Sequence, residues 1–134
     1  VVKYNMSSRE IIEELEIDQF KELLKNIGNK IIIVKFTAEW CKPCKKIQPL
    51  VNESFNKLND TFVIFEIDID ETMELYYALK TKKMVNGIPS ILAYYGNENR
   101  DVDKWYIPSD SVIGGNESEV KLFFDRCQIK GATM

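Results

Sequence analysis

The residues from Lys30 to Thr37 constrain the fold of this chain most, because they are apolar at almost every position. Four β-branched residues stand together in this segment, from Ile31 to Val34, which indicates a strand. Neighbouring side chains of a strand point to opposite sides of its sheet, so a strand that is apolar throughout needs cover on both faces. The segment therefore predicts a central strand with helices packed on both sides of it.

Strand and helix patterns alternate along the rest of the chain. Residues 9–15 fit either a short strand or the approach to a helix, and that helix is expected to be capped by Asp18 and to end at Gly28. Further elements follow, with helices predicted after Trp40, over 71–79 and after Asn116, and strands over 62–69, 90–95 and within 100–113. This order predicts an α/β fold in which a central mixed β-sheet of four to five strands is flanked by helices on both faces.

The length of 134 residues corresponds to about one domain, and no linker or internal repeat divides the chain. We therefore expect a single domain over 1–134, with 1–8 as a loosely ordered N-terminal extension and 129–134 as a C-terminal tail. The N-terminal segment lacks the regions of a secretory signal, and a leader removed before Val1 stays open. The longest apolar run, 31–34, is far too short for a membrane span, so we expect no membrane association and a cytoplasmic location.

The composition excludes several kinds of chemistry. The chain contains no histidine, which removes catalytic triads and metal sites built on imidazole. Its 18 basic and 21 acidic residues give a net charge of −3, so the charge gives no reason to expect nucleic acid or anionic lipid as a partner. Any proton transfer must therefore use carboxylates, lysines, tyrosines, thiols or water.

Two of the three cysteines, Cys41 and Cys44, are separated by two residues and lie between the central strand and the helix that follows it. The first-turn amides of a helix have no partner within the helix and carry partial positive charge, which favours a thiolate over a thiol. Cys41 is expected beside these amides, and Cys44 lies one turn further along, where it can attack a mixed disulfide formed on Cys41. The motif predicts a redox-active dithiol whose first sulfur is ionised and reachable from solvent.

Two other interpretations of the cysteine pair stay open at this point. Zinc takes about four ligands, and the remaining cysteine, Cys127, is far along the chain, so a metal or iron–sulfur site would have to bridge two protomers. A purely structural disulfide between Cys41 and Cys44 is the second alternative. No metal site is expected, and Cys127 lies on an apolar helical stripe that predicts a buried thiol. A regulatory or dimer-forming role for Cys127 is the alternative there.

The chain resembles the thioredoxin family in two motifs, Phe36-Thr37-Ala38-Glu39-Trp40-Cys41-Lys42-Pro43-Cys44-Lys45 and, downstream, Gly87-Ile88-Pro89-Ser90. The resemblance covers about residues 10–128 and implies a thioredoxin-like fold. It implies that Cys41 is the attacking thiolate and that Cys44 is the buried resolving thiol. It also implies that Pro89 is a cis-proline facing the dithiol, and that the backbone of Ile88 pairs with an extended substrate segment.

The same resemblance implies a docking surface and a reaction. Trp40 would flank the disulfide on the substrate-binding surface, together with Lys42 and Pro43. The implied activity is the reduction of protein disulfides through a mixed disulfide, by a monomer that needs no bound cofactor. Reducing equivalents would come from an NADPH-dependent thioredoxin reductase. A disulfide isomerase or oxidase stays open as an alternative.

The chain departs from the family pattern in the residues around the dithiol. Lys42 replaces the glycine that is usual between the first cysteine and the proline. The family commonly buries an aspartate on the central strand and pairs it with a lysine from the next strand, and the matching residues here are Lys35 and Glu66. We therefore expect an ion pair of reversed sign beneath the dithiol, which tunes the pKa of Cys44 or relays its proton. The alternative is that both side chains reach solvent at strand ends.

A second departure is the segment 99–115, which is longer than the usual last hairpin of the family. It contains Trp105 and Tyr106, which are expected to cap the core locally rather than to bind a ligand. The segment is also a candidate partner contact. A redox-idle adaptor that binds a partner through it is therefore the alternative from a different functional class.

Overall fold

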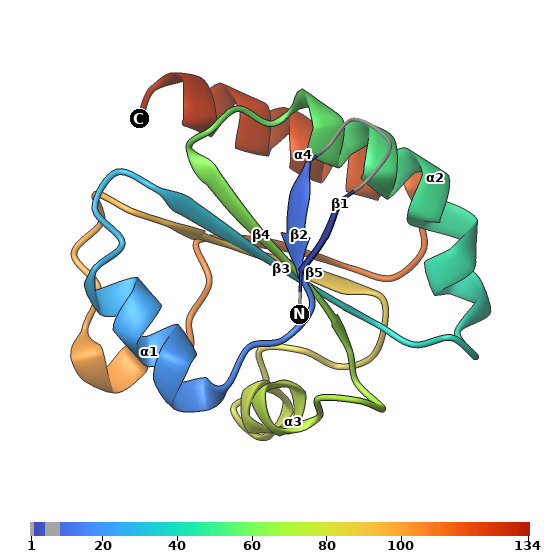
Figure 1. Ribbon diagram of the computed structural model, residues 1–134, viewed down its shortest axis with the longest axis horizontal. Coiled ribbons are helices and arrows are strands. Elements are labelled where there is room, and N and C mark those ends of the chain that lie inside the picture. The colour runs from blue at the N-terminus through green and yellow to red at the C-terminus, as the bar shows by residue number, and fades with distance from the viewer. Residues whose placement is uncertain (1, 5–8) are drawn as a thin grey trace.

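The computed structural model describes residues 2–4 and 9–134, in which one β-sheet is covered by helices on both faces (Figure 1). The described strands are β1 (Val2–Tyr4), β2 (Glu10–Ile12), β3 (Ile31–Thr37), β4 (Phe62–Asp68), β5 (Ser90–Tyr95) and β6 (Asp110–Ile113). The described helices are α1 (Ile17–Lys25), α2 (Lys42–Lys57), α3 (Glu74–Thr81), α4 (Glu117–Ala132) and the short 3₁₀ helix η1 (Val102–Lys104). The α/β class is confirmed, and the sheet has six strands where four to five were expected.

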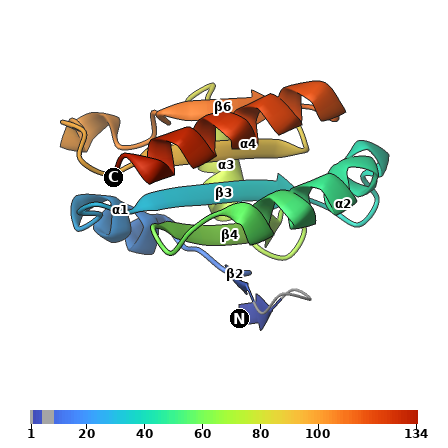
Figure 2. The same ribbon diagram turned by 90° about the horizontal axis from the view of Figure 1, so that it is seen from above.

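The sheet order is β1-β2-β4-β3-β5-β6, which places β3 near the middle of the sheet (Figure 2). Strand β3 runs parallel to β4 and antiparallel to β5. Strands β2 and β4 are also parallel, while β1 with β2 and β5 with β6 are antiparallel. All residues of β3 from Ile31 to Phe36 are buried, as its continuous apolar pattern predicts.

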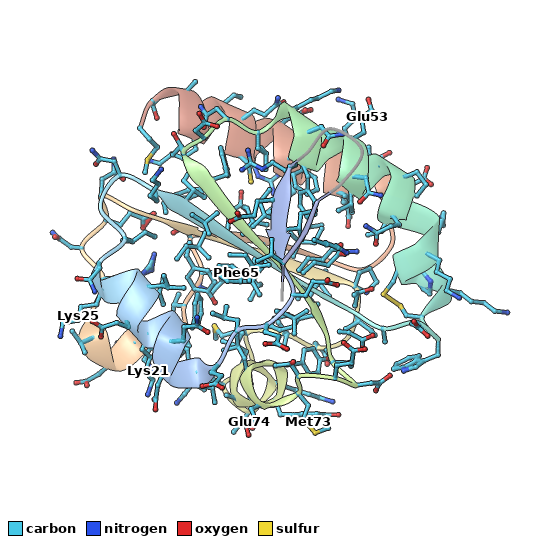
Figure 3. The ribbon with its side chains drawn as sticks, in the orientation of Figure 1. Lys21, Lys25, Glu53, Phe65, Met73 and Glu74 are labelled. Carbon is cyan, nitrogen blue, oxygen red and sulfur yellow. A yellow bond between two sulfur atoms is a disulfide. The ribbon has the colours of Figure 1, made fainter. Side chains whose placement is uncertain are left out.

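Two apolar clusters form the core, one on each face of the sheet. Helices α1 and α3 cover one cluster, to which β3 contributes Ile32, Val34 and Phe36. Helices α2 and α4 cover the other, to which β3 contributes Ile31 and Ile33. Figure 3 shows the buried ring of Phe65 near the middle of the molecule, whereas the labelled charged side chains, Lys21, Lys25, Glu53 and Glu74, lie at its periphery.

Two helices begin at different residues from those expected. Helix α1 is capped by Glu16, whose backbone N–H donates to the side chain of Gln19, and Asp18 lies within the first turn. The helix ends at Lys25, before Gly28. Helix α3 begins at Glu74 rather than at residue 71, because the preceding segment forms a turn in which two backbone N–H groups donate to the carbonyl of Asp68.

Both chain ends are more ordered than the sequence indicated, where the structure describes them. Residues 2–4 of the expected loose extension form β1, while residues 1 and 5–8 lie outside the described part. The expected tail at 129–134 belongs mostly to α4, which continues to Ala132. A side chain at Gly131 would meet the ring of Phe62 at 2.5 Å, so the last turn of α4 packs directly against β4.

The segment 99–115 is packed against the molecule rather than extended from it. Trp105 packs its ring edge-on against Phe20, and the hydroxyl of Tyr94 donates to the carbonyl of Tyr106 at 3.0 Å. The prediction that Trp105 and Tyr106 cap the core is confirmed. The last part of the segment is strand β6, which confirms the strand predicted within 100–113. In the chain described over 2–4 and 9–134, no helix is long and apolar enough to cross a membrane.

Candidate redox site

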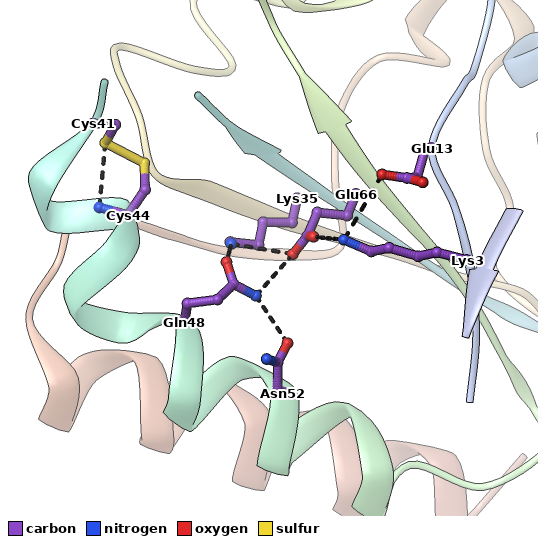
Figure 4. A network of polar contacts seen from close by, with 8 residues as sticks. All are labelled: Lys3, Glu13, Lys35, Cys41, Cys44, Gln48, Asn52 and Glu66. Atoms are coloured by element: carbon purple, nitrogen blue, oxygen red, sulfur yellow. Dashed lines mark hydrogen bonds and ion pairs between the residues drawn. A yellow bond between two sulfur atoms is a disulfide. The ribbon is translucent and has the colours of Figure 1, made fainter. Parts of the chain in front are cut away.

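Cys41 and Cys44 are joined by a disulfide at the start of α2, with their Cα atoms 5.3 Å apart (Figure 4). Cys41 is the residue that caps the helix, and its sulfur accepts a hydrogen bond from the backbone N–H of Cys44 at 3.2 Å. Because the first amides of a helix have no other partner in the helix and carry partial positive charge, this position stabilises a thiolate on Cys41 after reduction.

Both cysteines are buried in the disulfide form. Cys44 is 1% exposed, as expected, but Cys41 is 3% exposed, so the expectation of a sulfur open to solvent is wrong for this state. The reason is that both residues pack into the apolar cluster beneath α1 and α3. An attacking thiolate must therefore approach across the surface that surrounds the disulfide.

Trp40 forms an exposed part of that surface. Its side chain is 64% exposed, and its indole N–H donates to the carboxylate of Asp70 at 2.7 Å. This bond holds the ring beside the first cysteine. Lys42 and Pro43 are also exposed, and Gly115 from the start of α4 lies so close to Pro43 that an added Cβ would meet the proline at 2.9 Å.

The second sequence motif packs against the same part of the core. The peptide bond between Ile88 and Pro89 is cis, which confirms the expected proline geometry. Pro89 is buried, and its carbonyl accepts a hydrogen bond from Gly114 at 2.8 Å. Ile88 is partly buried and packs against the cluster that contains both cysteines. The two motifs that carry the resemblance therefore come together around the disulfide.

Lys35 and Glu66 form the expected ion pair of reversed sign. They are register partners on β3 and β4, and the ammonium of Lys35 lies 3.2 Å from a carboxylate oxygen of Glu66. Their side chains are 0% and 6% exposed, so the alternative in which they reach solvent is wrong. Both point away from the cluster under α1 and α3, since they alternate with Val34 and Phe36 on β3 and with Phe65 and Ile67 on β4.

The pair is strongly perturbed by its surroundings. Burial lowers the pKa of Lys35 below its usual 10.5, although the Glu66 carboxylate opposes this shift. Burial by itself would raise the pKa of Glu66, but the ammonium groups of Lys35 and Lys3 and the amide of Gln48 outweigh it and hold that pKa below 4.5. Glu66 is therefore held as a carboxylate between positive groups, which makes it a weak proton acceptor.

The sequence analysis missed Gln48 and Lys3, which contact this ion pair (Figure 4). Gln48, one turn after Cys44 on α2, accepts from the ammonium of Lys35 at 2.6 Å and donates to Glu66 at 3.1 Å. Lys3 of β1 donates to the other carboxylate oxygen of Glu66. Asp70, the partner of Trp40, was also missed. The spacing of Gln48 after Cys44 was a usable signal, whereas nothing in the sequence around Lys3 indicated its contact.

Cys127 takes no part in this site. It is fully buried on α4, and burial raises the pKa of its thiol to about 12, with Asp110 adding to the shift. The prediction of a buried thiol is confirmed. Within residues 2–4 and 9–134, no group of three or more cysteine, aspartate or glutamate side chains is arranged to hold a metal ion.

Comparison with known proteins gives a consistent family. The thioredoxin family model matches residues 11–109. Thioredoxin from Geodia cydonium is 35% identical over 102 residues, which cover 76% of this chain and 84% of that protein. Thioredoxin from Ophiophagus hannah is 35% identical over 83 residues, which cover 62% of this chain and 74% of the relative.

Solved structures show the same fold. The crystal structure of thioredoxin from Trypanosoma brucei brucei superposes with a TM-score of 0.65 at 20% identity, and the match covers 96% of this chain and 98% of that one. Plasmodium falciparum thioredoxin superposes with a TM-score of 0.64 at 21% identity over 94% of this chain and 93% of the other. With the disulfide placed at the start of α2, these matches show that the chain belongs to the thioredoxin family and is a thiol–disulfide oxidoreductase.

Proposed function

We propose that the protein reduces disulfides in other proteins, with Cys41 as the attacking residue and Cys44 as the resolving residue. The Cys41 thiolate attacks one sulfur of the substrate disulfide, which forms a mixed disulfide and releases the other substrate sulfur as a thiolate. The Cys44 thiolate then attacks the Cys41 sulfur, which closes the disulfide and releases the second substrate thiolate. The observation that carries this proposal is the Cys41 sulfur facing a backbone N–H at the start of α2.

The helix position alone gives a modest advantage. A shift of the Cys41 pKa from about 8.5 to about 7, the value known for thioredoxins, raises the thiolate fraction at pH 7 about 15-fold. The lower intrinsic nucleophilicity of the more acidic thiol removes about 5-fold of this gain, leaving about 3-fold. Most of the advantage must therefore come from Cys44, whose attack is intramolecular and has a high effective concentration.

We further propose that an extended substrate segment docks on Trp40, Lys42, Pro43, Ile88 and Pro89. The exposure of Trp40, Lys42 and Pro43 and the packing of Ile88 near the cysteines support this surface. Because Cys41 is buried, the surface around it decides which molecules reach the disulfide. A protein partner that fits this surface can reach the Cys41 sulfur, whereas a small thiol lacks these contacts. This arrangement favours protein substrates over small disulfides.

Lys35 and Glu66, on the opposite face of the sheet from the cluster that holds the cysteines, would tune the dithiol through α2. The Lys35 ammonium belongs to a network that contacts α2 one turn after Cys44, and a positive charge there favours a thiolate over a thiol. Glu66 keeps this charge buried by compensating it. Because the pKa of Glu66 is lowered, we assign the pair a role in setting the pKa of Cys44 rather than in storing its proton on Glu66.

The electron donor would be a thioredoxin reductase that draws on NADPH, and the site of action would be the cytoplasm. The family membership of the chain supports a reductase as the donor. One solved thioredoxin of the same fold, thioredoxin f2, forms a complex with ferredoxin:thioredoxin reductase. Reduction of the purified disulfide by an NADPH-dependent reductase, compared with a ferredoxin-dependent one, distinguishes the two donors.

The experiment for the reaction is single-turnover reduction of a protein disulfide, followed by mass spectrometry. The variant Cys44→Ser should stop at the mixed disulfide and retain the substrate through Cys41, whereas Cys41→Ser should retain nothing. Cys127→Ser is the matched control and should turn over like the parent. Retention through Cys44 rather than Cys41 would reverse the assigned roles. A measured potential above about −200 mV, rather than near the −270 mV of thioredoxins, would favour an oxidase or isomerase over a reductase.

A further inference from the structure

The N-terminal strand brings a second lysine to the buried ion pair. Lys3 lies on β1, outside the residues 11–109 that match the family. Its ammonium donates to Glu66, whose side chain is 6% exposed, while the side chain of Lys3 is 41% exposed. Its other acidic neighbour, Glu13, is 3.8 Å away and more exposed. The closer and better shielded partner of Lys3 is therefore the carboxylate of the buried pair.

The register of the strands explains how a residue so early in the chain reaches this position. Lys3 pairs with Ile11 of β2, which is buried in the cluster beneath α2 and α4. Side chains that are directly opposite each other on paired strands lie on the same face of the sheet. Lys3 therefore points toward the face that also holds Lys35 and Glu66. Figure 4 shows Lys3 entering the network from the side opposite to the disulfide.

The two lysines bond to different oxygens of the same carboxylate. Lys35 takes one oxygen of Glu66, together with Gln48, and Lys3 takes the other. Both oxygens of the carboxylate therefore accept hydrogen bonds, which hold the Glu66 side chain from two sides. Lys3, Lys35 and Glu66 together carry one positive charge in excess, and the Glu13 carboxylate, 3.8 Å from Lys3 and 37% exposed, offsets it only from the solvent-exposed side.

We propose that Lys3 is a positioning residue for the redox reaction, which anchors Glu66 from β1 and supplies the excess positive charge that favours the thiolate-bearing, reduced form of the Cys41–Cys44 pair. The inference rests on the proposed tuning of the dithiol by Lys35 and Glu66. Charge acts over longer distances in the protein interior than in water because screening there is weaker. Removal of Lys3 therefore makes the disulfide harder to reduce, although Lys3 touches neither cysteine.

The test compares Lys3→Gln, which removes the charge, with Lys3→Arg, which keeps it. The measured quantity is the equilibrium constant for reduction of the Cys41–Cys44 disulfide in glutathione buffers at pH 7. Lys3→Gln should lower this constant about threefold, the equivalent of about half a pKa unit in thiolate stability. Lys3→Arg should restore the constant to the value of the parent protein. An unchanged constant in Lys3→Gln, or a failure of Lys3→Arg to restore it, overturns the inference.

Two control variants separate this effect from simple changes in charge or stability. Lys121→Gln removes the same charge from an exposed ion pair with Asp125 on α4 and should leave the constant unchanged. Glu13→Gln removes the exposed carboxylate that faces Lys3 and should not lower the constant. An equal shift in either control shows a general charge effect and overturns the inference. A loss of free energy of unfolding in Lys3→Gln without a shift in the constant shows a merely structural role and also overturns it.

A final variant separates failure of this inference from failure of the proposed tuning. Lys35→Met/Glu66→Gln removes both buried charges, and it should shift the reduction constant. If it does so while Lys3→Gln does not, the inference alone fails; if it does not, the tuning fails as well. Gln48→Met, at a partly buried position, removes the link between α2 and the ion pair and replaces the double variant if that variant does not fold.

Discussion

The two faces of the sheet are built from the same strands but are filled differently. Toward α1 and α3, β3 contributes Ile32, Val34 and Phe36 to an apolar cluster that also holds the two motif cysteines. Toward α2 and α4, the same strand contributes Ile31 and Ile33 and then Lys35. Among the described residues, the buried charged side chains are Lys35 and Glu66, and both lie on this second face.

The difference is instructive because a buried ion pair seldom adds stability. Removing two charges from water costs several kcal/mol, and well-packed apolar residues are often as stable in the same space. On the face beneath α2, charged residues therefore replace apolar packing at the position where Lys35 contacts α2. We read the charged face as the half of the core that adjusts the chemistry of the dithiol, which itself lies in the apolar cluster.

The largest expected effect sharpens this contrast from the apolar side. Phe20→Ala removes a fully buried ring that packs edge-on against Tyr94 and Trp105, and should lower the free energy of unfolding by about 4 kcal/mol. The reduction constant of the disulfide should stay within experimental error of the parent. Urea unfolding and glutathione equilibration measure the two quantities. A shifted redox constant in this variant would break the division between the two faces.

The next effect tests the charged face. Glu66→Ala leaves Lys35 buried without its carboxylate and should lower the free energy of unfolding by about 3 kcal/mol. Unlike Phe20→Ala, it should also change the reduction constant, because the charge near α2 is no longer compensated. The same two measurements apply. If only stability changes, the charged network is structural, and the contrast between the faces loses its functional meaning.

The third prediction concerns pH. Burial raises the pKa of Glu66, but Lys35 and Lys3 hold it below 4.5 overall, so the unfolded chain binds the proton more readily. The contribution of Glu66 to stability is therefore complete above about pH 4.5 and is lost as the pH falls through its lower, folded-state pKa. Urea unfolding at a series of pH values should show this loss in the parent protein. Lys35→Met/Glu66→Gln should show a shallower acid dependence, and an identical dependence would contradict the assignment.

The smallest effect again concerns the apolar face. Tyr94→Phe removes the hydroxyl that donates to the carbonyl of Tyr106 and should cost about 1 kcal/mol of unfolding free energy. Burial raises the pKa of this hydroxyl, so it is a neutral donor throughout the working range. Activity should be unchanged, since the bond holds the segment 99–115 and not the dithiol. A loss of turnover with native stability would point instead to a partner contact through that segment.

The sequence was sufficient to predict the disulfide chemistry of the site because the motifs that indicate it are local. The Cys41–Cys44 spacing, the strand before it and the Gly87–Ser90 motif each depend on neighbouring residues, and the structure brings them together. The reversed pair of Lys35 and Glu66 was predicted from the resemblance to the thioredoxin family, and the register of β3 and β4 places the two residues side by side. The sequence motifs therefore predicted the cysteine pair and the residues closest to it.

The rest could not be predicted because it depends on contacts between distant parts of the chain. Lys3 reaches Glu66 only because β1 folds back on β2, and three residues are too few to show a strand pattern. The cap of α1 at Glu16 depends on the backbone N–H of Glu16 donating to the side chain of Gln19, whereas the sequence pattern indicated a cap at Asp18. The burial of Cys41 depends on how the edge of the sheet packs, which no local motif records.

The side-by-side register of Lys35 and Glu66 limits which substitutions can accumulate at these two positions. Exchanging the two residues keeps direct partners on neighbouring strands, but it brings a lysine at position 66 against Lys3, so Lys3 must change as well. A chain in which only one of them has switched sign would place two like charges together inside the molecule, which is costly. Lineages of this protein should thus keep, invert or discard the two positions jointly. A library randomised at both codons and selected for folding should return pairs of opposite charge or two neutral residues. Pairs with two like charges or a single charge should be rare.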